Sequence, residues 1–351
     1  MIEVQSSELP LNEHLELLLS VDGVHCDETT DKHSHPDHHE VPPWFDELKF
    51  KKGQQFYFNN LFALFIAKLS GLLCVLAVPS ILRILIFTKQ SSTVETAYRR
   101  YVATILYMHS WYNNDFQPGS KMWNALIEVR HKHHSASKRS IKSDNGPITQ
   151  IDMALTQFGF VGFALSRPEM LGLHFNQDEL EGFVHFWRVI GWILGVEDKY
   201  NLCRESAEET RELCDQLIIK YFAKNLRNTE DSFVYMCDKL LRGMWYVNPL
   251  IYVDSFKAFT FKLTDFVQYK LKTKVPESEQ ITLNTPTIVL NTFEQYLSDI
   301  FSYLLTNLFS YTLVRMYFNG QIRLTVFLLA YFPFLAFFSF GIRNSYVHVY
   351  Y

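Results

Sequence analysis

The sequence lacks an excess of basic residues, and it is poor in glycine and proline. Its 33 Lys and Arg are outnumbered by 37 Asp and Glu, which gives a formal net charge of −4. Nucleic-acid-binding domains carry a basic face, so no nucleic-acid partner is expected. Only 14 Gly and 12 Pro occur in 351 residues, which is too few for the many turns of an all-β fold.

Paired cysteines are also missing. The five cysteines are widely spaced and form no CxxC pair: Cys26, Cys74, Cys203, Cys214 and Cys237. This spacing argues against a structural zinc site and against a disulfide framework. The cysteines are therefore predicted to be buried, reduced thiols in a protein that faces the cytosol.

The first 43 residues contain little that could form a core. They are polar and acidic, and they carry His25, His33, His35, His38 and His39. No basic region followed by an apolar run opens the chain, so a secretory signal is not expected. A disordered, weakly metal-binding tail is predicted for 1–43. A metal site held on a helix by the His35–His38 pair is the alternative, although Pro36 lies between them and no Cys completes a site.

Acidic residues are absent from Leu48 to Val94. Within this stretch Tyr57–Phe87 is almost continuously apolar and is interrupted by Lys68, Pro79 and Arg83. A membrane-spanning helix needs about 20 apolar residues without such interruptions. Two core or membrane-surface helices, over 56–77 and 79–88, are therefore predicted.

Helix-start signals recur along the middle of the chain. Capping boxes of a Ser, Thr or Asn followed three residues later by an acidic residue occur at Thr149, Asn176 and Ser206. Further helices are predicted over 93–112, from Ser120 to about Lys138, and near 230–243. The expected fold is all-α, with one multi-helix domain over 44–275.

The C-terminal region, 276–351, is predicted to be amphipathic and transmembrane. Leu324–Ile342 is a run of 19 residues without a charge, flanked by Arg323 and Arg343. Pro333 and Gly341 within it are tolerated in membrane helices. A buried core helix is the alternative, since the preceding Phe293–Phe318 stretch is also aromatic and could lie at the membrane interface.

A cluster of histidines at Glu128–His134 raises the question of a metal site. Glu128 and His131 form one ExxH pair, but a di-iron bundle needs a second pair on another helix, and none occurs in the sequence. On a helix, Arg130 and His133 share a face, while His131 and His134 point aside. By itself this pattern is most often a solvated face.

The preceding helix places Arg100 and Thr104 on one face among apolar residues. An inward-pointing Arg needs an anionic partner, because an unpaired buried charge is very costly. A haem propionate, a phosphate or a neighbouring carboxylate would all serve, and an ordinary ion pair remains open.

Four segments together resemble a known family. The runs RRYVAT, WNALIEVRHKHH, PITQIDMALTQFGF and FWRVIGWILGVED are similar, in order and spacing, to the rubber-oxygenase family of latex-clearing proteins and MpaB-type oxygenases bound to the endoplasmic reticulum. The resemblance covers roughly Pro43 to Leu250. It implies an all-helical domain with one haem b and oxidative cleavage of a C=C bond in an isoprenoid chain. Carried over by motif, it makes His133 the iron ligand, with Arg130, Arg100 and Thr104 as cofactor-binding residues.

Two positions depart from the family pattern. Latex-clearing proteins have a Lys three residues after the motif Arg, where this chain has Ala103, and a catalytic Glu on the preceding helix, where this chain has no acid. A helical membrane protein that keeps the fold without catalysis is therefore the alternative. Either way, the expected partners are membrane lipid and a hydrophobic small molecule, at an internal membrane such as the endoplasmic reticulum.

Overall fold

The protein was analysed as a computed structural model that describes residues 9–20, 41–227, 230–271 and 290–349. Every regular element in these ranges is helical, which confirms the all-α prediction. The first helices are α1 (Leu11–Leu19), α3 (Glu47–Asn59), α4 (Leu61–Leu76), α5 (Pro79–Thr88), α6 (Val94–Asn113), α7 (Lys121–Lys142), α8 (Gln150–Ser166), α9 (Pro168–Leu171) and α10 (Gln177–Ile193). They are followed by η2 (Asp198–Tyr200), α11 (Ala207–Leu217), the π-helical η3 (Ile218–Phe222), α12 (Ala223–Arg227), α13 (Asp231–Trp245), α14 (Val253–Leu271), α15 (Thr292–Thr306), η5 (Leu308–Ser310), α16 (Thr312–Tyr331) and α17 (Phe334–Ser345).

Helix starts lie where the sequence places the caps. The Thr149 and Asn176 capping boxes are both complete, and Ser120 and Ser206 accept hydrogen bonds from the backbone N–H three residues on. Each cap satisfies amide groups that a helix N-terminus otherwise leaves without a partner. Local sequence therefore sets the start of α7, α8, α10 and α11.

Two glycine contacts fix the centre of the domain. A Cβ atom on Gly71 would lie 2.7 Å from the carbonyl oxygen of Gly159, and one on Gly53 would lie 2.4 Å from that of Gly182. The first contact brings α4 against α8 and the second brings α3 against α10. Because no side chain separates the backbones at these points, the helix pairs pack at close range and form one buried core.

The predicted helix over 56–77 is broken in the structure. α3 ends at Asn59, α4 starts at Leu61, and the two axes meet at 94°. The Asn60 side chain stabilises the bend: its Nδ2 donates to the carbonyl oxygens of Phe56 and His174, and its Oδ1 accepts from the His174 N–H. The predicted helix over 79–88 is present as α5.

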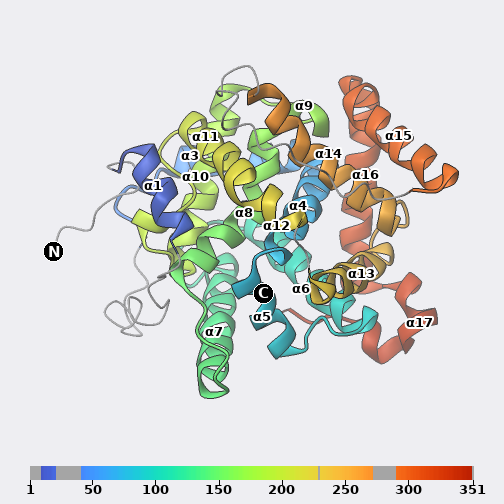
Figure 1. Ribbon diagram of the computed structural model, residues 1–351, viewed down its shortest axis with the longest axis horizontal. Coiled ribbons are helices and arrows are strands. Elements are labelled where there is room, and N and C mark those ends of the chain that lie inside the picture. The colour runs from blue at the N-terminus through green and yellow to red at the C-terminus, as the bar shows by residue number, and fades with distance from the viewer. Residues whose placement is uncertain (1–8, 21–40, 228–229, 272–289, 350–351) are drawn as a thin grey trace.

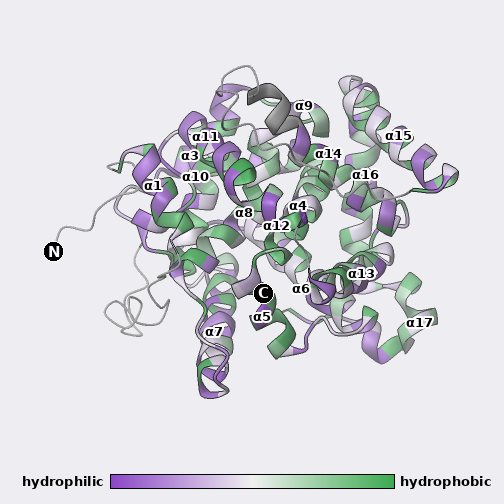
Figure 2. Ribbon diagram, viewed as in Figure 1, coloured by the Kyte–Doolittle hydropathy of each residue, from purple (hydrophilic) through white to green (hydrophobic). Residues whose placement is uncertain are grey.

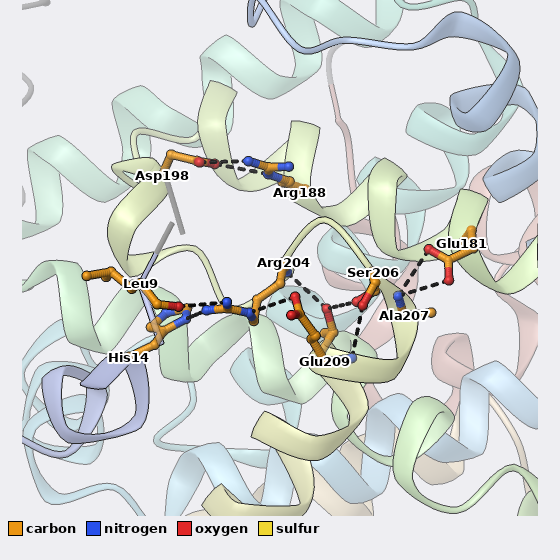
Figure 3. A network of polar contacts seen from close by, with 10 residues as sticks. Leu9, His14, Glu181, Arg188, Asp198, Arg204, Ser206, Ala207 and Glu209 are labelled. Carbon is orange, nitrogen blue, oxygen red and sulfur yellow. Dashed lines mark hydrogen bonds and ion pairs between the residues drawn. The ribbon is translucent and has the colours of Figure 1, made fainter. Parts of the chain in front are cut away.

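The prediction of a disordered segment over 1–43 is wrong for Leu11–Leu19. These residues form α1, whose Leu15 and Leu18 are buried in the core. His14 Nδ1 lies 3.0 Å from the Arg204 guanidinium, which also donates to the Leu9 carbonyl oxygen (Figure 3). The leucine spacing gives α1 one apolar face. The polar and acidic composition of the whole segment 1–43 masks this local pattern. The five histidines of the predicted metal-binding tail lie outside the described residues.

Three C-terminal helices line one edge of the molecule (Figure 1). α16 packs on α4 and α6, and its buried residues are Ile322, Val326 and Leu329. The Tyr98 hydroxyl on α6 donates to the Ser345 carbonyl oxygen at the end of α17. One stretch, Thr312–Ser345, is long and apolar enough to cross a membrane, and only 22% of its most apolar window is buried. That low burial disfavours the alternative of a core helix. The helix path is interrupted at Phe332–Pro333 and again at Gly341.

At the lower edge of the view in Figure 1, the C-terminal part of α7 projects from the domain, and it is mostly hydrophilic (Figure 2). The four cysteines in the described ranges are all buried and reduced, as predicted, and Cys26 lies outside those ranges. Burial raises the pKa of these thiols, which makes them unreactive.

Candidate functional site

A cavity of about 220 Å³ lies at the centre of the domain, and its lining comes from α4, α6, α7, α8 and α10 with single residues from further along the chain. Most of the lining is aliphatic or aromatic. Three of the four cofactor-binding residues predicted from sequence, Arg100, Thr104 and His133, contribute to it. Residues from two helices that are separated by a long turn in the sequence therefore meet at one site. The lining consists of Phe65, Lys68, Leu69, Leu72, Val75, Arg100, Tyr101, Thr104, Ile105, Tyr107, Met108, Trp111, Val129, His133, Met153, Thr156, Gln157, Gly159, Phe160, Trp187, Ile190, Gly191, Leu194, Val196 and Met244.

His133 enters the cavity from α7. Its Nδ1 atom is buried and has no hydrogen-bond partner among the described residues. Burial, with a smaller contribution from the nearby Arg100 guanidinium, lowers the pKa of His133 to about 4. The imidazole is therefore neutral at pH 7, which is the form in which histidine binds a metal.

Arg100 and Thr104 enter from α6, one turn apart. The Arg100 guanidinium donates to Ser91 Oγ at 3.4 Å and lies 5.7 Å from the centre of the Tyr101 ring. No carboxylate forms an ion pair with it within the described part of the chain. The Thr104 hydroxyl donates to the Arg100 carbonyl oxygen at 3.2 Å. Arg100 therefore keeps most of its donors available for an anionic ligand.

The fourth predicted residue, Arg130, is not among the residues that line the cavity. Its guanidinium donates to the carbonyl oxygen of Ile193, the last residue of α10, at 3.3 Å. It thus joins α7 to a helix C-terminus, where a cation is favourable. His131 is exposed, and neither His131 nor His134 reaches the cavity.

Sequence reasoning missed Lys68 as a site residue. This lysine lines the cavity from α4, and its Nζ atom lies 3.8 Å from the Met108 sulfur and 5.4 Å from the centre of the Tyr57 ring. No acidic group pairs with it in the described ranges. Burial lowers the pKa of Lys68 to about 7. The available signal was a lone cation in a helix whose other side chains are apolar or small.

Two further polar contacts of α10 are structural. His185 Nε2 accepts a hydrogen bond from the backbone N–H of Asp46. Arg188 donates two hydrogen bonds to the Asp198 carboxylate, at 2.7 and 3.1 Å, in a buried ion pair. Figure 3 shows the two side chains facing each other. Neither pair lines the cavity, and both tie loops to α10.

The donor set in the cavity fits a haem. It offers a neutral imidazole with a buried nitrogen that lacks a partner, a guanidinium without a carboxylate partner, and aromatic and aliphatic walls. A histidine is one of the side chains that bind haem iron, and apolar walls and a cation suit the macrocycle and its propionates. Within the residues that the structure describes, no group of three or more His, Cys, Asp or Glu offers an alternative metal site.

Comparison with known proteins defines the class. Residues 56–262, more than half of the chain, match a family described as ER-bound oxygenase mpaB/B'/rubber oxygenase, catalytic domain. The chain belongs to this family of oxygenase catalytic domains. Among solved structures, a latex-clearing protein in the closed state matches with a TM-score of 0.47 at 15% identity, over 90% of this chain and 85% of that one. No curated protein sequence matches the chain.

Proposed function

We propose that this protein is a haem b-dependent oxygenase that cleaves a C=C bond of a lipid-soluble, isoprenoid-like substrate at an internal membrane. The observation that supports this most is the meeting of His133, Arg100 and Thr104 at one apolar cavity. A haem bound there would supply the activation of dioxygen. Family membership supports the oxygenase class.

The protein's own residues have three tasks in this proposal. His133 would hold the iron as a neutral imidazole, and Arg100 would pair with a propionate. The apolar walls exclude water and bind a hydrocarbon chain, for which burial of apolar surface is the main driving force. Thr104 lines the same wall one turn after Arg100, and its hydroxyl donates to the Arg100 carbonyl oxygen.

The C-terminal helices support a membrane location. α15, α16 and α17 expose many large apolar and aromatic side chains, among them Tyr317, Phe327, Tyr331 and Phe338, and Phe338 is 92% exposed. Contiguous exposed apolar surface of this kind marks an interaction site, and aromatic residues favour the membrane interface. We propose that this edge binds the bilayer, at the endoplasmic reticulum or another internal membrane.

A second candidate function is that of a haem or lipid carrier without catalysis. No Asp or Glu lines the cavity within the described residues, and Ala103 is not part of the lining. A carrier would bind the same ligands but would not consume dioxygen. Oxygen uptake in the presence of a polyunsaturated isoprenoid lipid, measured with an electrode, separates the two functions.

The visible absorption spectrum of the purified protein tests the proposal. We expect a Soret band in the parent that is lost in His133→Ala and retained in His131→Ala and His134→Ala, because only His133 faces the cavity. The two neighbouring variants control for general damage to α7. A parent without a Soret band after reconstitution with haemin, or equal loss in all three variants, would exclude His133 as the axial ligand.

A further inference from the structure

We propose that Lys68 binds a carboxylate at one end of the substrate, so that the ligand is an amphipathic lipid acid rather than a pure hydrocarbon. This inference rests on the proposed function for the lipid-like character of the ligand. It goes beyond that function in assigning the polar end of the ligand and the residue that recognises it.

The surroundings of Lys68 leave its charge uncompensated. Its nearest groups are a thioether and an aromatic ring, and neither carries a negative charge. Lys68 lines the cavity, whereas no Asp or Glu among the described residues does. This end of the cavity is therefore electropositive, and the positive charges of Lys68 and Arg323 help burial to lower the pKa of His109, the residue after Met108, to about 4. An anion bound there would compensate the buried positive charge of Lys68, which is costly without a partner.

The position of Lys68 separates it from the groups assigned to the haem. Arg100, Thr104 and Met108 follow one another at four-residue intervals on α6, so they form one stripe along the cavity. Lys68 contacts Met108, at the far end of this stripe from Arg100. Eight helical residues span about 12 Å along the axis. Arg100 and Lys68 can therefore bind two different anionic groups.

The charge available at this end selects a monoanion. Lys68 is the one cation that lines the cavity there, within the described residues. A diphosphate carries more negative charge and is usually bound with a divalent cation, for which the described residues offer no cluster of ligands. A carboxylate matches one ammonium group and forms a charge-assisted hydrogen bond with it.

Binding of geranic acid and geraniol to the full-length holoprotein tests this assignment. The two compounds share one isoprenoid chain and differ in a carboxylate against a hydroxyl. By calorimetric titration at pH 7 we expect the acid to bind the parent at least about tenfold more tightly, which corresponds to about 1.4 kcal/mol. In Lys68→Met, whose unbranched side chain is one heavy atom shorter and uncharged, the ratio should fall to about one, with the geraniol affinity unchanged. Lys51→Met, which removes an exposed lysine on α3, should behave as the parent.

Three results would overturn the proposal: equal affinity of the parent for both compounds, an acid preference that persists in Lys68→Met, or a loss of preference in Lys51→Met as well. The first result is measured on the parent alone, so it does not depend on whether a variant folds. The test of Lys68 is also independent of the test for haem. A protein with a Soret band but no acid preference keeps the oxygenase proposal, and acid preference without haem keeps the assignment of Lys68.

Discussion

Arg100 is the residue at which haem binding can be tested most directly. Its guanidinium faces the cavity and has one long hydrogen bond, to Ser91. If it pairs with a propionate, Arg100→Ala removes a charge-assisted hydrogen bond worth about 1.5–3 kcal/mol, which weakens haem binding by one to two decades. Arg100→Lys should recover part of this loss, because an ammonium group lacks the planar fork of the guanidinium. Haem titration of the apoprotein measures both.

Thr104→Val is the matched control for that experiment. The Thr104 hydroxyl donates within its own helix, so its removal should cost at most about 1 kcal/mol. Parental haem affinity in Arg100→Ala would remove Arg100 from the site. A larger effect in Thr104→Val than in Arg100→Ala would mean that the helix, rather than the charge, holds the cofactor.

At this scale, part of the site could be predicted from sequence. The helical phase places Arg100 and Thr104 on one face and separates His133 from its neighbours, and the structure agrees. Lys68 could not be assigned, because every face of α4 is apolar and the sequence does not show which one meets the cavity. Arg130 shares a helical face with His133, yet it contacts the end of α10. Helical phase predicts the direction in which a side chain points, whereas tertiary packing decides which residue it contacts.

Among the helices, the crossing of α4 and α8 is the contact that positions the cavity. Gly71→Ala would place a Cβ atom 2.7 Å from the Gly159 carbonyl oxygen and 2.9 Å from its Cα. Backbone atoms cannot rotate away, so the helices must separate. Overpacking of this kind costs about 1–3 kcal/mol. We expect a lower urea midpoint for Gly71→Ala.

Gly320→Ala is the control for this substitution. A Cβ atom there meets no other atom within 4 Å, and the residue is exposed on α16. Alanine should therefore be neutral or stabilising by up to about 1 kcal/mol, through helix propensity. Equal midpoints for the two alanine variants would show that the α4–α8 contact tolerates expansion.

The helices themselves were largely predictable, because their caps are local. Thr149, Asn176 and Ser120 satisfy amide groups within the same turn, and nothing distant is needed to place them. The bend at Asn60 was not predictable. Its neighbours include no Pro or Gly, and its side chain is held by the backbone of His174, more than one hundred residues away.

For the whole molecule, buried histidines predict acid sensitivity. Burial, aided by Arg204, lowers the pKa of His14 to about 4, against 6.5 for the free side chain. Between these values the unfolded chain binds a proton that the folded chain does not, so stability falls as the pH decreases from 6.5 toward 4. For the fully buried His14 the slope is at most about 1.4 kcal/mol per pH unit. The pKa values of His133, His109 and His185 are lowered to about 4 as well.

Urea unfolding at pH 7.5, 6 and 5 measures this dependence. His14→Gln should show a shallower decrease than the parent, by the contribution of one proton, whatever its stability at pH 7.5. A decrease of unchanged steepness would mean that carboxyl groups or the other histidines account for the acid sensitivity, and that His14 does not.

Membrane binding is the second prediction for the whole molecule. The double variant Phe327→Glu, Phe338→Glu places charges on the exposed face of α16 and α17, where each side chain is more than half exposed. A carboxylate costs several kcal/mol inside a bilayer. We expect the parent to cofloat with liposomes of neutral and anionic phospholipid, and the variant to stay in solution with an unchanged circular dichroism spectrum.

Leu48→Glu is the matched control, because Leu48 is 75% exposed on α3, a helix outside the C-terminal edge. It should cofloat as the parent does. Flotation of the double variant, or loss of flotation in Leu48→Glu, would show that α15, α16 and α17 are not the membrane-binding surface.

The packing of α16 has a consequence for how a ligand reaches the protein. α16 touches both α4 and α6, and these two helices also form the wall of the cavity around Lys68. On a bilayer bound through that edge, a lipid would have to pass only one layer of helices and would never dissolve in water. Its rate of uptake would then follow its mole fraction in the bilayer and not its concentration in the surrounding solution. Diluting the vesicles at a fixed lipid composition would leave the rate unchanged, whereas diluting the ligand within the bilayer would slow it in proportion.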